Sequence, residues 1–160
     1  MATTSDRHEV EGNRIFIRLR CVIIHGDKLL ASYSKEHDFY FCPGGHMIWG
    51  ESVVDGAKRE LKEELGDDVE FEFKKILYIR EFLEKEKGKH SLELFILGDI
   101  NKDQELEGRP DPEHENGQWW ATWLDLANLP GSFYPEIIAK KIAEDYKNGF
   151  PSQGEYVGMI

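Results

Sequence analysis

The sequence predicts a single α+β domain, in which strands joined as hairpins are combined with two helices. The chain has 160 residues, the size of one ordinary domain with one core. Several short runs alternate between apolar and polar residues, as half-buried strands do. Two longer segments repeat apolar residues at helical spacing. Because these segments do not alternate strictly with the strands, an α+β arrangement is favoured over repeated βαβ units.

The first half of the domain begins with a predicted hairpin. Residues 14–24 alternate and then turn apolar, which is typical of a strand, and the His-Gly-Asp sequence at 25–27 is a turn signal. Residues 28–34 are predicted to form the return strand. A short strand over 39–41 follows, and Pro43 with two glycines ends it. This part of the chain therefore reads as strand, turn, strand and a further short strand.

A helix is predicted directly after these glycines. Ser52 is a suitable N-cap, Leu65 is the last residue of the helical pattern, and Gly66 stands where a C-cap glycine belongs. The apolar positions recur at helical spacing and form one stripe along the helix. The residues of this stripe are Val54, Ala57, Leu61 and Leu65.

The second half of the domain contains two strands, a long loop and a second helix. Residues 69–84 and 91–100 are rich in strand-forming residues, and a turn separates them. The acidic stretch 101–118 has no apolar periodicity, and loops of this length are often functional. Residues 119–129 are predicted to form a strand that leads into a helical turn. The second helix is predicted over 135–148, with Pro135 in its first turn and Gly149 after its end.

The two ends of the chain are less regular than its middle. Residues 1–12 are expected to form a mobile N-terminal arm, and residues 13–160 are expected to form the single domain. The tail over 150–160 has no clear pattern.

Charge and cysteine content limit the partners and the compartment. The net charge of −11 repels phosphate polymers, so we expect no nucleic acid polymer as a partner. A small phosphorylated substrate is compatible when metal cations bridge the negative charges. Cys21 and Cys42 form no C-x-x-C pattern, the start "MATTSDRHEV" has no apolar core, and no apolar run is long enough to cross a bilayer. We therefore expect reduced thiols in a cytoplasmic protein without a membrane partner.

Three glutamates stand close together on the first predicted helix. At about 100° per residue, Glu60 and Glu64 lie one turn apart on one line, with Glu63 beside both. Like charges at this spacing destabilise a helix by roughly 0.2–0.5 kcal/mol, and glutamates near its C-terminus oppose the macrodipole. A divalent cation would reverse both effects, because clustered carboxylate oxygens are what Mg²⁺ requires. The alternative is a solvated acidic face that Lys62 and Arg59 partly neutralise.

The residues before this helix favour the metal site. Gly44 and Gly45 let the backbone approach a ligand closely, and the loop that follows them ends at Glu51. Glu51 and Arg59 are able to brace the loop against the helix by a charged hydrogen bond. An acidic face alone would not indicate a metal site, but the loop, the brace and the glutamates together do.

These residues resemble the Nudix box, the motif of the MutT-like Nudix hydrolases. The matching positions are Gly45, Glu51, Arg59, Glu60, Leu61, Glu63, Glu64 and Gly66. Two positions depart from the pattern, since Ile48 replaces a commonly acidic residue and Asp67 replaces an apolar one. The resemblance implies a mixed β-sheet sandwiched between helices (α/β/α). It also implies an enzyme that hydrolyses the diphosphate linkage of a nucleoside diphosphate joined to a group X.

The resemblance further assigns roles within the box. It implies that Glu60 and Glu64 are the principal ligands of Mg²⁺, with Mn²⁺ as a substitute. Glu63 would share a second ion, and the Gly45 carbonyl would complete the first site. Arg59 would orient a glutamate, and Glu51 would pair with Arg59 or reach a metal through water. Metal ions would then neutralise the diphosphate while water attacks phosphorus in line.

A general base outside the box is a further expectation. In some relatives a glutamate from a distant loop fills this role, and the acidic loop offers Glu113 and Glu115. We select Glu115, because its distance from Trp119 aligns better. The alternative for either residue is an exposed loop carboxylate without a catalytic role.

Three basic side chains are candidate substrate contacts. Arg18 and Arg20 share one face of a strand, where they either face solvent or meet a substrate phosphate. His46 follows the glycines and either contacts a phosphate or lines the loop. Trp119, Trp120 and Trp123 are expected to be core and sheet-face residues. The alternative is that one of them, or Tyr33, Phe39 or Tyr40, stacks on a base, and the sequence does not select among them.

The expected substrate is a small nucleotide. A compact domain favours nucleoside di- or triphosphates, and the alternative is an ADP-ribose or nucleotide-sugar pyrophosphatase. A homodimer is compatible with the sequence and would weaken this preference. A catalytically silent nucleotide-binding domain is the non-enzymatic alternative, although the box retains all its glutamates and its arginine.

Overall fold

The structure is a computed structural model that describes residues 9–10 and 12–160. Within these residues it contains two α-helices, α1 (Val53–Leu65) and α2 (Glu136–Asn148). The strands are β1 (Glu9–Val10), β2 (Asn13–His25), β3 (Lys28–Ser34), β4 (Phe39–Phe41), β5 (Phe71–Glu84), β6 (Lys89–Ile100), β7 (Trp119–Asp125) and β8 (Glu155–Met159). Short 3-10 turns occupy Lys85–Lys87, Gln104–Leu106 and Leu126–Asn128.

The predicted helices and strands are all present, and the tail adds one element that the sequence left open. Residues of the tail form β8, which pairs with β5 in parallel. The expected mobile arm over residues 1–12 falls mostly on residues outside the described part. The described pair Glu9–Val10 lies antiparallel to the start of β2.

The strands form one mixed sheet. Its order is β4-β3-β2-β6-β5-β8, with β7 beside β3 and β1 beside β2. The pairs β2–β6 and β5–β8 are parallel, and the other pairs are antiparallel. The α+β class and the mixed sheet that the resemblance implied are therefore confirmed.

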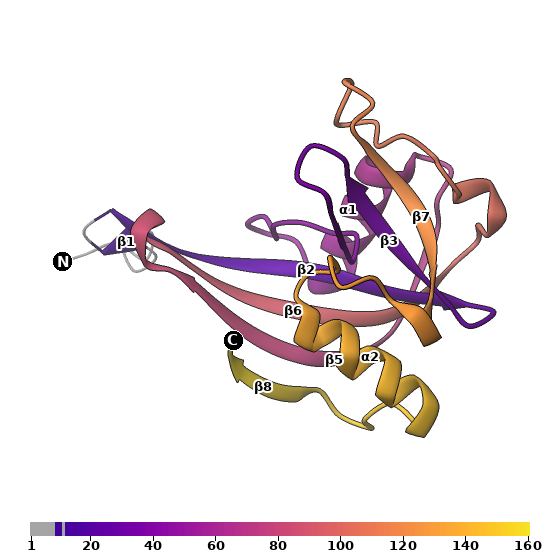
Figure 1. The fold of residues 1–160 in the computed structure, drawn as a ribbon. Helices are drawn as coiled ribbons and strands as arrows, with labels where there is room; N and C mark the ends of the chain where they lie inside the picture. Colours follow the sequence, from indigo (N-terminus) through magenta and orange to yellow (C-terminus); the bar gives the residue numbers. More distant parts are fainter. Residues whose placement is uncertain (1–8, 11) are drawn as a thin grey trace.

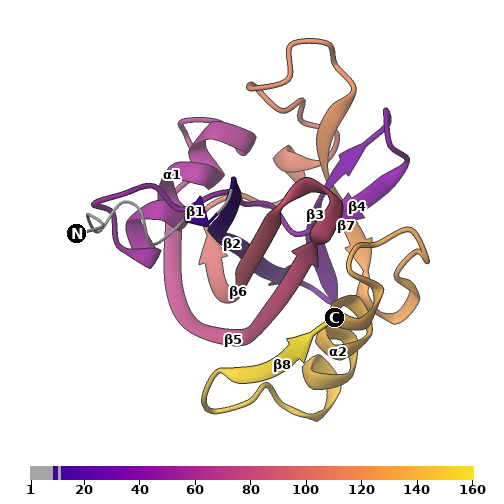
Figure 2. The same cartoon turned by 90° about the vertical axis from the view of Figure 1, so that its left-hand side faces the viewer.

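The two helices cover opposite faces of this sheet (Figures 1 and 2). Leu61 of α1 shares a buried cluster with Leu19 and Ile23 of β2. Ile138 of α2 shares a second cluster with Val22 of the same strand. Because successive residues of a strand point to opposite faces, the two clusters lie on the two sides of the sheet. The sandwich between helices is thus formed by two cores that one layer of strands separates.

Part of the sheet extends beyond both helices. The N-terminal part of β2 and the β5–β6 hairpin project from the body as an arm (Figure 1). From the arm into the body, β2 pairs with β6 from Arg14 to Ile23 without interruption. One sheet therefore forms both the central layer between the two helices and a surface that projects beyond them.

Helix α1 begins and ends where its sequence predicts. The Ser52 hydroxyl accepts a hydrogen bond from the Asp55 backbone N–H at 3.1 Å, which satisfies one free donor of the first turn. Gly66 follows the last residue with φ 118°, a conformation that favours glycine, and its N–H donates to the Lys62 carbonyl at 2.9 Å. These caps fix the register of the glutamates on the helix surface.

Two expectations about the chain concern its cysteines and membrane segments. Cys21 and Cys42 are both buried and unpaired. Across residues 9–10 and 12–160, neither helix has the length and apolar character needed to span a bilayer.

Candidate active site

The loop between β4 and α1 runs along β2 as an additional edge. The Leu19 N–H donates to the Gly45 carbonyl at 2.8 Å, and the Met47 N–H donates to the Ile17 carbonyl at 2.9 Å. The loop therefore lies on the edge of β2 opposite to β6. This backbone pairing carries the chain from the sheet to the start of α1.

Two glycines make this close approach sterically feasible. A Cβ at Gly44 would lie 2.2 Å from the Leu19 carbonyl oxygen, and the φ of 135° also favours glycine. A Cβ at Gly45 would lie 2.3 Å from Glu60 Oε2. The missing side chains therefore let the loop backbone contact β2 on one side and a helix carboxylate on the other.

Arg59 holds the acidic residues of the loop and helix together. Its Nε and Nη2 donate to the two carboxylate oxygens of Glu51 at 3.0 and 2.8 Å. Its Nη1 donates to Glu60 at 2.8 Å and to Glu63 at 2.9 Å, and its Nη2 also reaches the His46 carbonyl at 3.0 Å. The expected brace between Glu51 and Arg59 is present in bidentate form. The hydrogen bond from Arg59 lowers the pKa of Glu51.

Glu60 and Glu64 are the carboxyls most affected by burial. Glu60 is only 7% exposed, and burial raises its pKa, although Arg59 opposes this shift. Burial raises the pKa of Glu64 to about 8, against the opposing hydrogen bond that the Gly44 N–H donates at 2.9 Å. Two carboxyls on one line of a helix thus lack sufficient counter-charge, which is the condition that a bound cation relieves.

The donor set fits a hard divalent cation. Glu60, Glu63 and Glu64 supply carboxylate oxygens, which suit Mg²⁺ and Mn²⁺. The Gly45 carbonyl accepts one hydrogen bond from Leu19, which leaves a second lone pair. In the described part of the chain, no three His, Cys, Asp or Glu side chains are already gathered to hold a metal. Arg59 donates to Glu63 and to one Glu60 oxygen, so a cation would compete with the guanidinium for these oxygens.

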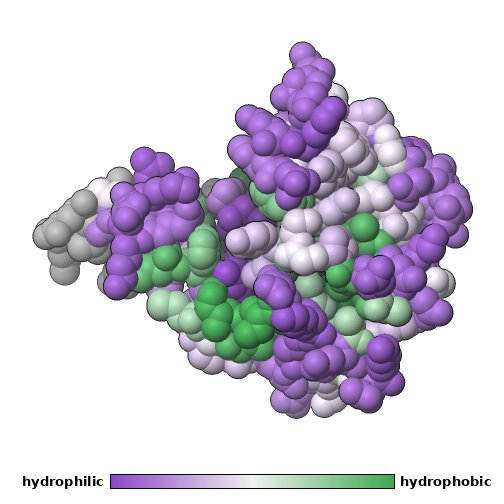
Figure 3. All heavy atoms as spheres, viewed as in Figure 1, coloured by the Kyte–Doolittle hydropathy of each residue, from purple (hydrophilic) through white to green (hydrophobic). Residues whose placement is uncertain are grey.

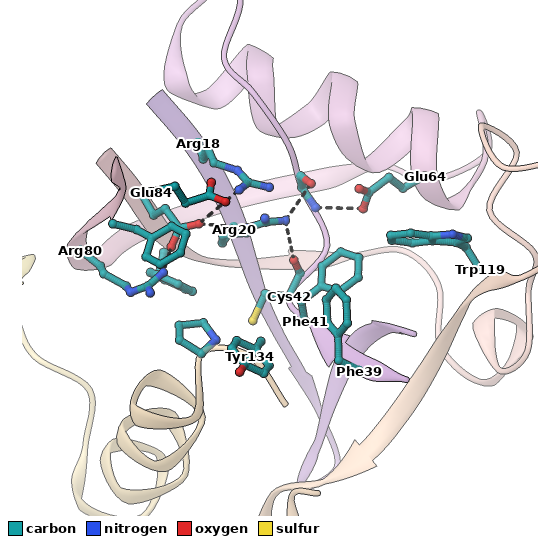
Figure 4. Close-up of a pocket in the computed structure, with 15 residues that line it drawn as sticks. Arg18, Arg20, Phe39, Phe41, Cys42, Glu64, Arg80, Glu84, Trp119 and Tyr134 are labelled. Atoms are coloured by element: carbon teal, nitrogen blue, oxygen red, sulfur yellow. Dashed lines mark hydrogen bonds and ion pairs between the residues drawn. The ribbon is translucent and has the colours of Figure 1, made fainter. Parts of the chain in front are cut away.

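A cavity of about 610 Å³ opens beside these carboxyls. Figure 3 shows the surface hollowed where the arm meets the body, and Figure 4 shows the side chains around this space. Glu64 and Gly44 border the cavity, so it adjoins the box. Aromatic residues from β4, β7 and the segment before α2 form one wall, and they are Phe39, Phe41, Trp119 and Tyr134.

Arginines of β2 and β5 form the opposite wall. Arg80 pairs with the buried Glu93, and Arg20 Nη1 donates to the Gly44 carbonyl at 3.1 Å. Arg18 is different, because its Nε is buried without a hydrogen-bond partner and its closest carboxylate oxygen, on Glu93, lies 3.9 Å from Nη1. Burial lowers the pKa of Arg18 to about 10. Arg18 is therefore a cation of the cavity with unused hydrogen-bonding capacity.

The acidic loop carries both candidate glutamates, Glu113 and Glu115, and both side chains are exposed. The charge of Glu113 acts on Glu60 and raises its pKa. Glu115 is exposed and makes no ion pair or side-chain hydrogen bond with any residue in the described part of the chain. The buried Asp111 fixes this loop, since its carboxylate accepts the Glu113 N–H at 2.8 Å and lies 3.0 Å from His114 Nδ1.

The remaining candidates separate into cavity residues and others. Arg18 and Arg20 line the cavity, as their shared strand face allowed. The His46 side chain is exposed, lies 5.0 Å from the Phe16 ring between centroids, and does not line the cavity. Trp123 belongs to the core at 7% exposure. Sequence reasoning missed Glu93 and Arg80, although their positions opposite each other on paired strands carry opposite charges.

The fold and the box together define a protein of the Nudix class. The NUDIX domain family matches residues 17–142, which is more than half of the chain, so the chain belongs to this family. The resemblance seen in the box is thereby confirmed, and the protein is a Nudix diphosphohydrolase.

Solved structures show the same fold at low sequence identity. A MutT Nudix hydrolase from Burkholderia pseudomallei aligns with a TM-score of 0.65 and 21% identity, covering 81% of this chain and 98% of its own. An ADP-ribose pyrophosphatase from Streptococcus suis aligns with a TM-score of 0.61 and 19% identity, covering 91% of this chain and 98% of its own. A Nudix hydrolase from Nitrosomonas europaea aligns with a TM-score of 0.68 and 16% identity, covering 91% of this chain and 78% of its own. These comparisons support the architecture and leave the substrate open.

Replacing Arg59 by lysine is expected to loosen the loop before α1, because an ammonium group cannot form the two parallel hydrogen bonds to Glu51. The Ile48 N–H donates to Glu51 Oε1 at 2.8 Å. Its amide hydrogen exchange should become at least about 10-fold faster in Arg59→Lys. The control is Lys62→Ala, which removes only a surface ion pair with Glu70. Unchanged exchange at Ile48 in Arg59→Lys would contradict the brace.

Proposed function

We propose that this protein is a Mg²⁺-dependent hydrolase that cleaves the diphosphate linkage of a nucleoside diphosphate joined to a group X. The observation that carries the proposal is the continuity between the box carboxyls and the cavity, which Glu64 and Gly44 border. A diphosphate beside these residues would leave its nucleoside against the aromatic wall. Such a concave site with few polar anchors is typical of small-molecule binding.

Glu60, Glu63, Glu64 and the Gly45 carbonyl are the residues proposed to hold the cation. The burial of Glu60 and Glu64 and the repulsion between neighbouring carboxyls support this assignment. When bound, Mg²⁺ or Mn²⁺ supplies charge neutralisation and Lewis-acid polarisation of the diphosphate.

The other residues of the box act by positioning these carboxylates. Arg59 contacts Glu60 and Glu63 through one nitrogen, so it sets the side-chain orientation of both. Glu51 holds the guanidinium from the opposite side with two hydrogen bonds. Arg59 and Glu51 are therefore proposed to fix the geometry of the metal ligands, since such supporting contacts commonly determine ligand orientation.

Basic residues are proposed to bind the anionic part of the substrate. Arg18 and Arg20 face the cavity from β2 and attract phosphate oxygens in an otherwise acidic protein. His46, exposed on the loop beside the box, is the third proposed contact. The aromatic wall excludes water from one side of the cavity and offers flat surfaces for a base.

A carboxylate of the acidic loop is proposed to accept a proton from the attacking water. Glu113 is the first candidate, because its charge contributes to the raised pKa of Glu60. Glu115 is the alternative that the sequence favours, and it would require the loop to rearrange when substrate binds. In either case the proton passes to the glutamate as oxygen attacks phosphorus.

Nucleoside di- or triphosphates are the proposed substrate class. The unused hydrogen-bonding capacity of Arg18 favours a substrate with anionic charge beyond what Arg20 can neutralise. The alternative is ADP-ribose or a nucleotide sugar, and the similar fold of the Streptococcus suis ADP-ribose pyrophosphatase is consistent with it.

Glu64→Gln is expected to lower turnover by at least about 100-fold, because it removes a charged oxygen from the proposed metal site. Phosphate release from a panel of nucleoside di- and triphosphates, ADP-ribose and nucleotide sugars measures the effect, with Mg²⁺ and with EDTA. Calorimetric titration of Mn²⁺ provides a second readout without substrate. Glu70→Gln, an exposed carboxylate outside the box, is the control. Wild-type turnover in Glu64→Gln at saturating Mg²⁺ would show that the metal assignment is wrong.

Arg18→Gln is expected to raise KM for nucleoside triphosphates about 10- to 100-fold with little change in kcat, because it removes an anion contact made in the ground state. The matched measurement is the KM of Arg18→Gln for ADP-ribose, which should rise less than its KM for nucleoside triphosphates. Lys58→Gln on the exposed side of α1 serves as the charge control. An equal rise of KM for both substrate classes would contradict the preference for di- and triphosphates.

Glu113→Gln is expected to lower kcat by about 100-fold or more, the range found when a general base is removed. Glu115→Gln should lower kcat by less than about fivefold if Glu113 is the base. The reverse result would assign the role to Glu115. Small effects in both variants would exclude a loop glutamate from proton transfer.

A further inference from the structure

The arm of the sheet carries an uncovered apolar face on the side of α1. Leu19 of β2 is buried in the core beneath α1. Ile17 and Ile15 follow on the same face at two-residue intervals, yet they are 41% and 54% exposed. The helix therefore covers the base of this face and leaves the outer part open.

Neighbouring strands continue the same face across the arm. Ile15 lies level with His90 of β6, which lies level with Leu83 of β5. Ile17 lies level with Leu92, which aligns through β5 with Met159 of β8. The next level ends at Tyr156 of β8, beside Ile79.

Most exposed large apolar residues of the described chain lie on this face or beside it. The "arm face" is defined here as Ile15, Ile17, Leu83, Tyr156 and Met159, with exposed fractions between 36% and 62%. Met47 joins the loop to Ile17 by a backbone hydrogen bond, and the next two residues of that loop are Ile48 and Trp49, which are 54% and 100% exposed. These seven belong to the eleven large apolar residues that are exposed in the described part.

The charged group within the arm face is already paired. Glu81 lies between its apolar residues, and its two carboxylate oxygens contact His90 Nε2 at 2.8 Å and the Tyr156 hydroxyl at 2.7 Å. Burying this face would therefore not leave an unpartnered carboxylate, which is the main penalty for covering a charge.

We propose that the arm face, extended by Ile48 and Trp49, is the interface of a homodimer. A standard interface buries about 800 Å² per partner. An aromatic side chain buries roughly 150–250 Å², so the fully exposed Trp49 and the largely exposed Tyr156 supply a large part of that area. In a two-fold dimer each copy contributes the same surface patch, so the patch must be able to contact itself. An apolar face meets this condition. Exposed apolar residues that gather on one face in this way are one mark of a protein–protein interaction site.

Other occupants fit less well. Residues 1–8, "MATTSDRH", offer only Met1 and Ala2 as apolar side chains, so they cannot bury five large ones. An anionic membrane surface would repel a chain of net charge −11. The same charge makes two copies repel each other, so apolar contact must hold them together. Salt should consequently strengthen the dimer by screening the repulsion.

The interface would also reach the loop of the box. Trp49 precedes Glu51 by two residues, and Glu51 is held by Arg59. Contact of Trp49 with a second copy would restrict the loop that positions this pair. The dimer thus links a surface remote from the cavity to the order of the site.

The test is sedimentation velocity of the full chain across micromolar concentrations, at low and at high NaCl. The wild type should sediment as a dimer, more tightly at high salt. Ile15→Glu should raise the dimer dissociation constant at least about 10-fold, and Leu83→Glu on another strand should do the same. Ile137→Glu is the matched control, because Ile137 is 53% exposed on α2, away from the arm face.

Three results would overturn the proposal. The wild type would sediment as a monomer at every concentration, or Ile137→Glu would dissociate it as strongly as Ile15→Glu. Alternatively, a monomer would co-sediment with phosphatidylcholine vesicles through the arm face, which would assign the face to a lipid surface. The measurement uses neither substrate nor metal, so it stands independently of the proposed hydrolysis.

Discussion

The contact between the helix carboxyls and the backbone of residues 44–45 is the constraint on which the rest of the site depends. Gly44 donates its N–H to Glu64, and the Glu60 carboxylate occupies the space where a side chain at Gly45 would lie. The same two glycines rest on the Leu19 backbone, so the loop touches the sheet and the helix at once. A larger residue at either position would separate the helix from the sheet edge. This approach also brings Glu64 and Gly44 together at the border of the cavity.

Electrostatics explains why Arg59 occupies its central position. Several carboxyls gather around one guanidinium in a chain of net charge −11, and burial raises the pKa of both Glu60 and Glu64. Arg59 supplies one positive charge through a fork that lysine cannot reproduce. It forms two hydrogen bonds with Glu51 and shares Nη1 between Glu60 and Glu63, so one positive charge faces three carboxylates. A divalent cation has the charge to fill that deficit, and the arginine then has the role of holding the frame in which the cation binds.

The parts of the fold that depend on local chemistry could be predicted from the sequence. Ser52 and Gly66 bound α1 as caps, and the glutamates follow from helical spacing. The parts that depend on pairing between distant strands could not. By alternation alone, Glu93 on β6 resembles a solvent-facing residue, because a period of two does not say which face of the sheet is covered. In the structure Glu93 is buried against Arg80, on the face of the sheet that carries the cavity. The acidic loop shows the opposite case, since Asp111 organises it through contacts with the Glu113 N–H and His114, which lie two and three residues away.

The alternation of β2 connects the site to the projecting surface. Arg18 and Arg20 point into the cavity, whereas Ile15 and Ile17, at odd-numbered positions of the same strand, point to the opposite side. A shift of one residue in register would place the isoleucines in the cavity and the arginines on the apolar surface. The pairing of β2 with β6 over ten consecutive positions opposes such a shift. The same hydrogen-bonded ladder therefore preserves the cationic wall of the cavity and the apolar face of the arm, so a substitution that changes the register would alter both surfaces together.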